Sequence, residues 1–320
     1  LGPGAPMSVK ADGRLGLPDI ESFMPSLKEF TSRIPARRPL DFDIDANGTV
    51  ENLVIDRLRA EMPEVLRLEA DGYARNLLDL KKLQADVTFD GRLYSPRVAD
   101  SFLSGTGVEL PAFTIKGSAG VLRDAYHADF RLLSDAGDIA ADGRVSLGPE
   151  TYSADIGLRE FDVARFYPAP GIGRVSATIR ATGAGFNPLS GRAVTDALVN
   201  ISRIRYRDRD LSDITADVIL DNGGNLSLCL NSPNQGLDFD IEGTGTIRPD
   251  NYAFDIAARL RDVDLWSLGL TDNVPARATS TSREPPVPAD GYTTSVSRPT
   301  AWTGTFQAIT SICPEASLPM

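Results

Sequence analysis

Residues 222–242 read NGGNLSLCLNSPNQGLDFDIE, and the alternation within them recurs through most of the chain. Leu226, Leu228 and Leu230 alternate with polar residues, and the same period of two returns at Phe239 and Ile241. Such a period is typical of a β-strand with one apolar face, and the preceding Asn-Gly-Gly-Asn is typical of a turn. This stretch therefore predicts antiparallel strands joined by short turns.

The same alternation extends in both directions from this stretch. Near the N-terminus, apolar residues alternate with aspartates from Leu40 to Asp45, and Asn47–Gly48 follows as a two-residue hairpin signal. Asp90–Gly91 and Asp142–Gly143 are further turn signals at the spacing expected of all-β chains. We therefore expect a repetitive antiparallel sheet over residues 40–270.

Helical patterns are scarce. Apolar residues recur at helical spacing only near residues 22–34, within a leading segment of residues 1–39. Further short helices are predicted near residues 96–103, 161–167 and 263–269. Residues 271–320 are rich in Pro, Ser and Thr and lack alternation, which predicts a disordered tail or linker. A second reading of that segment is an altered reading frame.

An internal repeat spans one hundred residues. Tyr152-Ser-Ala-Asp155-Ile156 corresponds to Tyr252-Ala-Phe-Asp255-Ile256, and an Asp-Val segment follows each copy. Both copies are interpreted as a strand, an acidic turn and a short helix that carries an inward aromatic residue, Phe166 or Trp266. Recurring units favour an array that grows by adding strands.

Composition excludes several classes of protein. The net charge of −11 and the absence of a basic patch argue against nucleic-acid binding. No apolar run is long enough to span a membrane, since a spanning helix needs about 20 residues. The chain opens at Leu1 without a signal peptide, so we expect an internal piece of a longer protein. The cysteines, Cys229 and Cys313, permit an oxidising compartment without establishing one.

No motif in the sequence predicts catalysis, a metal site or a cofactor. His127, the single histidine, lies in an alternating segment and lacks a nucleophile motif nearby. The series Asp41-x-Asp43-x-Asp45 lacks the glutamate that closes a calcium-binding loop, because the twelfth position is Asn52. It is interpreted as a solvated strand face, as is the series from Asp238 to Glu242. Gly183-x-Gly185 precedes further strand residues, which predicts an ordinary loop.

Residues 8–270 resemble TamB, the translocation and assembly module protein of Gram-negative bacteria, and the wider AsmA-like family. The resemblance rests on the stretch IRATGAGFNPLSGRAVTDALVNISRIRYRDRDLSDITADVILDNGGNLSLCLNSPNQGLDFDIEGTG, residues 179–245, and on the repeated strand with its Asp-Val segment. It implies a mainly β fold, an elongated and curled antiparallel sheet called a β-taco. It also implies a periplasmic protein that is attached to the inner membrane and acts in outer-membrane biogenesis. The implied roles are phospholipid transport between the inner and outer membranes, assembly of outer-membrane proteins, or both, with an outer-membrane barrel assembly protein as partner.

The sequence and the resemblance suggest the same mechanism, in which the apolar face shields phospholipid acyl chains from water. Transport along such a groove needs no catalytic residue. The residues expected to line it are Ile179, Leu226, Leu228, Leu230, Phe239, Ile241, Tyr252, Phe254 and Ile256. The main alternative is a structural β-repeat scaffold or adhesin segment in which the same residues form a closed core. A polysaccharide-active β-helix enzyme is a third reading, disfavoured because acidic and aromatic residues are not clustered.

Overall fold

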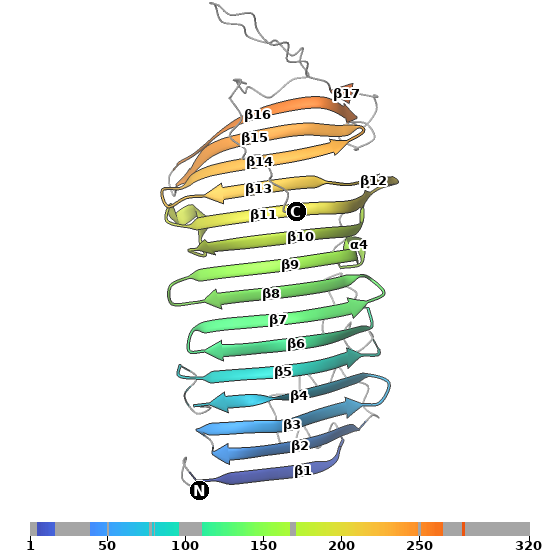
Figure 1. Ribbon diagram of the computed structural model, residues 1–320, viewed down its shortest axis with the longest axis vertical. Helices are drawn as coiled ribbons and strands as arrows, with labels where there is room; N and C mark the ends of the chain where they lie inside the picture. The colour runs from blue at the N-terminus through green and yellow to red at the C-terminus, as the bar shows by residue number, and fades with distance from the viewer. Residues whose placement is uncertain are drawn as a thin grey trace, which may run out of the picture. The chain divides into compact units, whose positions relative to one another are not determined.

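The computed structural model describes residues 5–16, 39–49, 51–76, 79, 81–95, 111–166, 171–248, 251–264 and 277–278. They are mainly β, and the strands form open antiparallel sheet, so the predicted fold class is confirmed (Figure 1). The helices expected at 22–34 and 96–103 lie outside the described residues, as does the tail apart from residues 277–278. The chain divides into two compact units, which are described separately.

Unit 1 comprises residues 1–186 and 197–211. Its strands pair in sequence order, each antiparallel to the next from β1 to β10, and β12 pairs with β11. The strands are β1 (Met7–Leu15), β2 (Leu40–Thr49), β3 (Asn52–Met62), β4 (Leu66–Arg75), β5 (Gln84–Leu93), β6 (Phe113–Leu122), β7 (Ala125–Ser134), β8 (Asp138–Ser146), β9 (Thr151–Asp162), β10 (Ile172–Ala184), β11 (Val194–Tyr206) and β12 (Arg209–Leu211).

Unit 2 comprises residues 187–196 and 212–320. It therefore includes the start of β11, from Val194 to Asp196. Its strands β13 to β17 again pair with their neighbours in sequence, and β14, β15 and β16 bend visibly in Figure 1. A short 3₁₀ helix, η2 (Pro188–Ser190), begins where Asn187 Oδ1 accepts a hydrogen bond from Leu189 N at 3.0 Å. The strands are β13 (Ile214–Leu220), β14 (Asn225–Asn234), β15 (Leu237–Arg248), β16 (Asn251–Asp264) and β17 (Arg277–Ala278).

Several predicted turns lie inside strands instead. Asn47 and Gly48 belong to β2, and the hairpin closes later, where Thr49 pairs with Asn52. Asp90–Gly91 lies within β5 and Asp142–Gly143 within β8, so these two turn predictions are wrong. The reason is that each segment is paired on both sides by neighbouring strands, which overrides the local turn preference. The turn at residues 222–224 is confirmed, because β13 ends at Leu220 and β14 begins at Asn225.

The predicted short helices have different outcomes. A helix near 161–167 is present as α4 (Val163–Phe166), although Phe161 and Asp162 still belong to β9. The prediction of a corresponding helix near 263–269 is wrong for Val263 and Asp264, the residues of that range that the structure describes. Val263 and Asp264 continue β16, because Val263 pairs with Leu237 on one side and with Ala278 of β17 on the other.

The internal repeat has a counterpart in backbone geometry. Pairing is irregular near Glu160 of β9, and an irregularity recurs one hundred residues later, near Leu260 of β16. The end of each long strand is tied to an earlier turn in a similar way: Asp162 N of β9 donates to Ala136 O in the β7–β8 turn at 2.8 Å, and Asp264 N of β16 donates to Gly236 O in the β14–β15 turn at 2.9 Å. Each copy therefore contains a long strand with an irregularity near its end.

Candidate functional site

One side of unit 1 is apolar across ten consecutive strands, β1 to β10. Directly opposed residues of antiparallel strands point to the same side of a sheet, so the register identifies the residues that share it. We call this side the unit 1 apolar face. Its central ladder consists of Ala11, Ile44, Leu58, Ala70, Phe89, Gly117, Phe130, Ala141, Ile156 and Ile179.

Parallel ladders on the same face are equally apolar. On one side of the central ladder lie Gly13, Phe42, Ala60, Leu68, Gly91, Ile115, Leu132, Ile139, Leu158 and Ala177. On its other side lie Val9, Ala46, Ile55, Gly72, Val87, Ala119, Ala128, Gly143, Ala154 and Ala181. None of these three ladders of the unit 1 apolar face contains a charged residue.

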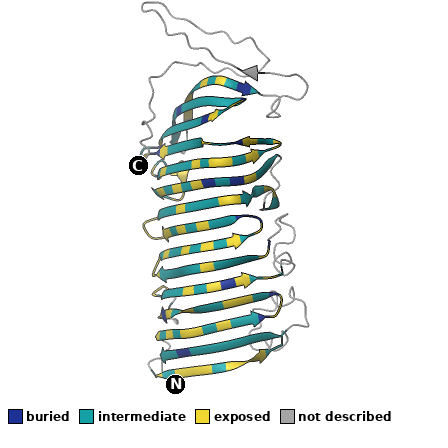
Figure 2. Cartoon of the chain, turned by 45° about the vertical axis from the view of Figure 1, so that its right-hand side comes forward, coloured by how far each residue is buried: buried dark blue, intermediate teal, exposed yellow. Residues whose placement is uncertain are grey.

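The unit 1 apolar face is open to solvent over much of its area. Most of its described residues are half-buried, as the prevalence of intermediate burial along the strands indicates (Figure 2). Leu68 is 36% exposed and Tyr126 is 47% exposed. In a sheet enclosed within a protein core, large apolar side chains would be buried far more completely.

Unit 2 has its own apolar side, which we call the unit 2 apolar face. Its ladders run from Leu226 through Gly245 to Phe254, and from Leu228 through Gly243 to Ile256. Phe254 and Ile256 are each 50% exposed. A Cβ atom on Gly245 would lie 2.5 Å from Cδ1 of Phe254, so this ring covers the glycine.

The proposed groove residues divide between the two faces. Ile179 lies on the unit 1 apolar face, opposite Ile156. On the unit 2 apolar face the register brings together Leu226, Leu228, Leu230, Phe239, Ile241, Phe254 and Ile256. Tyr252 occupies a position on the same side, opposite Ile247. Sequence reasoning missed most of the unit 1 apolar face, although the alternation of β2 to β8 could have identified it.

The opposite side of unit 1, the unit 1 polar face, is covered by cross-strand ion pairs. The aspartates of β2 that were compared with a calcium loop each contact a cation: Arg14 lies 2.6 Å from Asp41, Arg57 lies 3.2 Å from Asp43, and Lys10 lies 3.1 Å from Asp45. The hydrogen bond from Arg14 lowers the pKa of Asp41 below its ordinary value. Such exposed pairs contribute little stability individually, but together they disfavour slippage of the strands.

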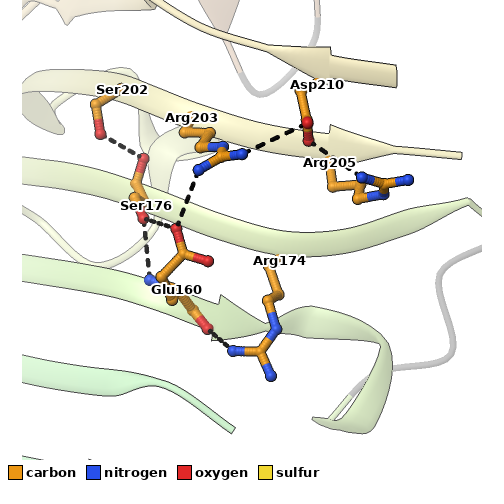
Figure 3. Close-up of polar contacts among 7 residues, drawn as sticks. All are labelled: Glu160, Arg174, Ser176, Ser202, Arg203, Arg205 and Asp210. Atoms are coloured by element: carbon orange, nitrogen blue, oxygen red, sulfur yellow. Dashed lines mark hydrogen bonds and ion pairs between the residues drawn. The ribbon is translucent and has the colours of Figure 1, made fainter. Parts of the chain in front are cut away.

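A polar cluster near the ends of β9 to β12 connects neighbouring strands (Figure 3). Glu160, which has a positive φ of 48°, donates its backbone N–H to Ser176 Oγ at 2.9 Å. Arg203 lies 4.0 Å from the Glu160 carboxylate and 3.5 Å from that of Asp210. Arg174 Nη1 donates to Glu160 O at 3.1 Å. These bonds fix an irregular part of β9 to the adjacent strands.

His127 lies on the unit 1 polar face, in β7. Its Nε2 is 3.2 Å from Asp86 of β5, and the contact crosses β6 above Gly120, the residue paired with both. A Cβ atom on Gly120 would lie 2.3 Å from His127 Cε1, so glycine is needed for this contact. The pair has no serine or cysteine nucleophile among its described contacts, and its role in the structure is a cross-strand bridge.

In unit 2, Arg261 connects the carboxylates of Asp238 and Asp240. Its Nε donates to Asp238 Oδ1 at 2.7 Å, and its Nη1 contacts Asp240 Oδ2. The hydrogen bond from Arg261 lowers the pKa of Asp240 below its ordinary value. The acidic series from Asp238 to Glu242 is therefore partly neutralised by a cation of the same sheet.

Hollows in the surface lie on the polar sides. One of about 470 Å³ on unit 2 is lined by polar residues that include Ser227, Thr244 and Asp255 and by apolar residues that include Ile219, Leu226 and Ala253. A smaller one of about 280 Å³ on unit 1 lies among Arg67, Glu69 and Asp90. The described residues contain no group of three side chains suited to hold a metal ion. They also contain no helix both long and apolar enough to cross a membrane.

No protein-family model matches the chain, and no curated protein or solved structure is significantly similar to it. The two apolar faces are the features of the described residues that most clearly suggest a function.

Proposed function

We propose that this chain is a section of a TamB-like protein that conducts phospholipids between the inner and outer membranes of a Gram-negative cell. The observation that supports the proposal is the unit 1 apolar face, which continues without a charged residue along the central ladder of ten strands. Its half-exposed side chains could replace water around an acyl chain. The proposal includes a periplasmic location and an outer-membrane barrel assembly protein as partner.

The energetics of such a surface suit transport. Each methylene group removed from water contributes about 0.8 kcal/mol, so one acyl chain gains several kcal/mol from contacts that have no preferred direction. Since neighbouring ladders present similar apolar groups, a lipid would meet similar contacts at each strand. Movement along the sheet would then require neither a catalytic residue nor a cofactor.

The test is capture of lipid by the purified chain. Mass spectrometry of the protein purified from a Gram-negative host is expected to detect bound phospholipid. Phe254→Asp combined with Ile256→Asp places charge on the half-exposed unit 2 apolar face. The double variant is expected to lower the amount of phospholipid bound at this face several-fold. Ala253→Asp is the matched control, because Ala253 lies in the same strand, β16, but on the opposite, polar side of the sheet, where it pairs with Thr246 of β15.

The alternative is a structural scaffold or adhesin segment without lipid cargo. It predicts no bound phospholipid in the wild-type chain, and it predicts that the control and the double variant behave alike. Circular dichroism should accompany each measurement, so that loss of lipid is not confused with loss of the sheet.

A further inference from the structure

The unit 1 apolar face is larger than the apolar patches that soluble proteins leave uncovered. Its three ladders lie about 6.8 Å apart and cross ten strands that lie about 4.8 Å apart, so together they cover roughly 1,000 Å². The largest apolar patch on an ordinary monomer is about 300–600 Å². A face of this size therefore calls for an occupant in water.

Exposed side chains occur on this face from the first strand to the eighth. Val9 of β1, Leu68 of β4, Tyr126 of β7 and Val145 of β8 are 39%, 36%, 47% and 37% exposed. Each of them opposes an apolar residue or a glycine on the neighbouring strands, which places all four on the apolar side. The face is therefore accessible across most of the sheet.

The other side of the same strands is unsuited to a broad, dry contact. One ladder of the unit 1 polar face is charged at seven consecutive strands and consists of Asp12, Asp43, Arg59, Glu69, Asp90, Lys116 and Arg131. Covering this ladder with protein would remove its charges from water, which is costly even for paired ions. A large partner surface can therefore approach the sheet only from the apolar side.

We propose that, in the absence of lipid, two copies of the chain pair through their unit 1 apolar faces. Each copy carries the same uncharged face, so a two-fold axis covers both faces at once. The pair would be a sandwich with its sheets about 10 Å apart and its strands crossing at about 30°. A stable interface buries about 800 Å² on each partner, which an overlap of about eight of the ten strands supplies.

Pairing goes beyond the proposed function and sets a condition on it. A second copy and phospholipid acyl chains require the same surface, so each excludes the other. A lipid that binds only the single chain separates the pair by mass action. This release rests on the proposed function, whereas the pairing itself does not.

Sedimentation of the full chain over a range of concentrations tests the pairing, after bound lipid has been removed with a detergent that is then dialysed away. The wild-type chain is expected to change from one copy to two as its concentration rises. Leu68→Asp combined with Tyr126→Asp places charges on β4 and β7, near the middle of the ten strands. The dissociation constant of the pair should rise about a hundredfold or more, because these charges would be buried without partners.

Val54→Asp combined with Leu133→Asp is the matched control. These residues are 42% and 51% exposed and lie on the unit 1 polar face, where Val54 opposes Asn47 and Leu133 opposes Thr114. The control variant should pair like the wild-type chain, and circular dichroism should show the same sheet in all three proteins. A wild-type chain that stays single, or equal loss of pairing in the two variants, would overturn the inference and leave lipid conduction standing.

Addition of dihexanoylphosphatidylcholine, below the concentration at which it forms micelles, tests the release. The wild-type pair is expected to separate as this lipid binds. Lipid that binds while the pair persists would overturn the shared surface. A pair that persists and binds no lipid would instead overturn the proposed function and support pairing alone.

Discussion

At the scale of single residues, the glycines of the apolar faces provide space. Glycine ordinarily weakens a strand because it offers no side chain to pack. Here several glycines lie where a neighbour occupies the position of a Cβ atom: on Gly13 it would be 3.2 Å from the Phe42 ring, and on Gly117 it would be 2.1 Å from Asp129 O. These glycines allow aromatic rings and neighbouring strands to approach closely.

Two alanine substitutions on the unit 1 apolar face should therefore differ in their effect on stability. Gly117→Ala is expected to lower the free energy of unfolding by about 1–3 kcal/mol, because the added methyl overlaps backbone atoms of β7. Gly143→Ala is expected to leave it unchanged or raise it by up to about 1 kcal/mol, since its Cβ would meet only Ser153 O, at 3.6 Å. Urea unfolding followed by circular dichroism measures both, and equal destabilisation would contradict the argument.

At the scale of elements, the period of two predicted the strands and their apolar side but not the turns. Gly48, Gly91 and Gly143 suggested turns, yet they lie inside strands, on the apolar face. In the turns that the structure shows, Arg123 and Glu150 have positive φ, which is uncommon for arginine and glutamate and therefore could not be predicted from residue type. A local signal cannot distinguish a glycine needed for conformation from one needed for space.

Other features of the candidate site depend on distant parts of the chain. β1 was not predicted, because its apolar positions include the small residues Ala11 and Gly13, and only pairing with β2 makes it part of the sheet. The apolar side of unit 2 could be predicted from Leu226 to Ile241, since each strand alternates clearly. The exposure of individual apolar residues, such as Met62 at 2% and Leu122 at 56%, could not be predicted, because it depends on what packs around each strand end.

The turn between β8 and β9 offers a test at this scale. Glu150 has a φ of 52°, which costs a residue with a Cβ atom about 1–2 kcal/mol. Glu150→Gly should remove that strain and, after the greater flexibility of the unfolded chain is deducted, raise stability by about 0.5–1 kcal/mol. Thr151→Gly, at the first residue of β9, should instead lower it by a similar amount. A loss of thermal stability in the Glu150 variant would show that the turn is unstrained.

At the scale of the whole molecule, the described strands of each unit contact mainly their neighbours in sequence. Pairing in sequence order resembles a solenoid more than a closed core, because each strand depends on the two beside it. Stability is then expected to vary along the chain, and local opening should be possible without global unfolding. Such a sheet could admit a lipid at one set of strands while the others remain intact.

Hydrogen exchange can measure this independence. Ala141→Asp introduces a charge on the apolar side of β8, between Phe130 and Ile156, and should cost about 1–3 kcal/mol. Amide protection in β7, β8 and β9 should fall about tenfold or more, since each 1.4 kcal/mol is a factor of ten. Protection in β14 and β15 of unit 2 should stay within twofold of the wild-type value, an order-of-magnitude bound that follows from neighbour-only coupling.

The control for this experiment lies at the adjacent position. Asp142 is directly opposed by Asp129 and Asp155 on the unit 1 polar face, and like charges opposite one another repel. Asp142→Asn should therefore preserve or increase protection in the same strands. If Ala141→Asp lowered protection equally in β8 and in β15, the two units would unfold as one cooperative body. Movement of a lipid by successive local openings would then be excluded.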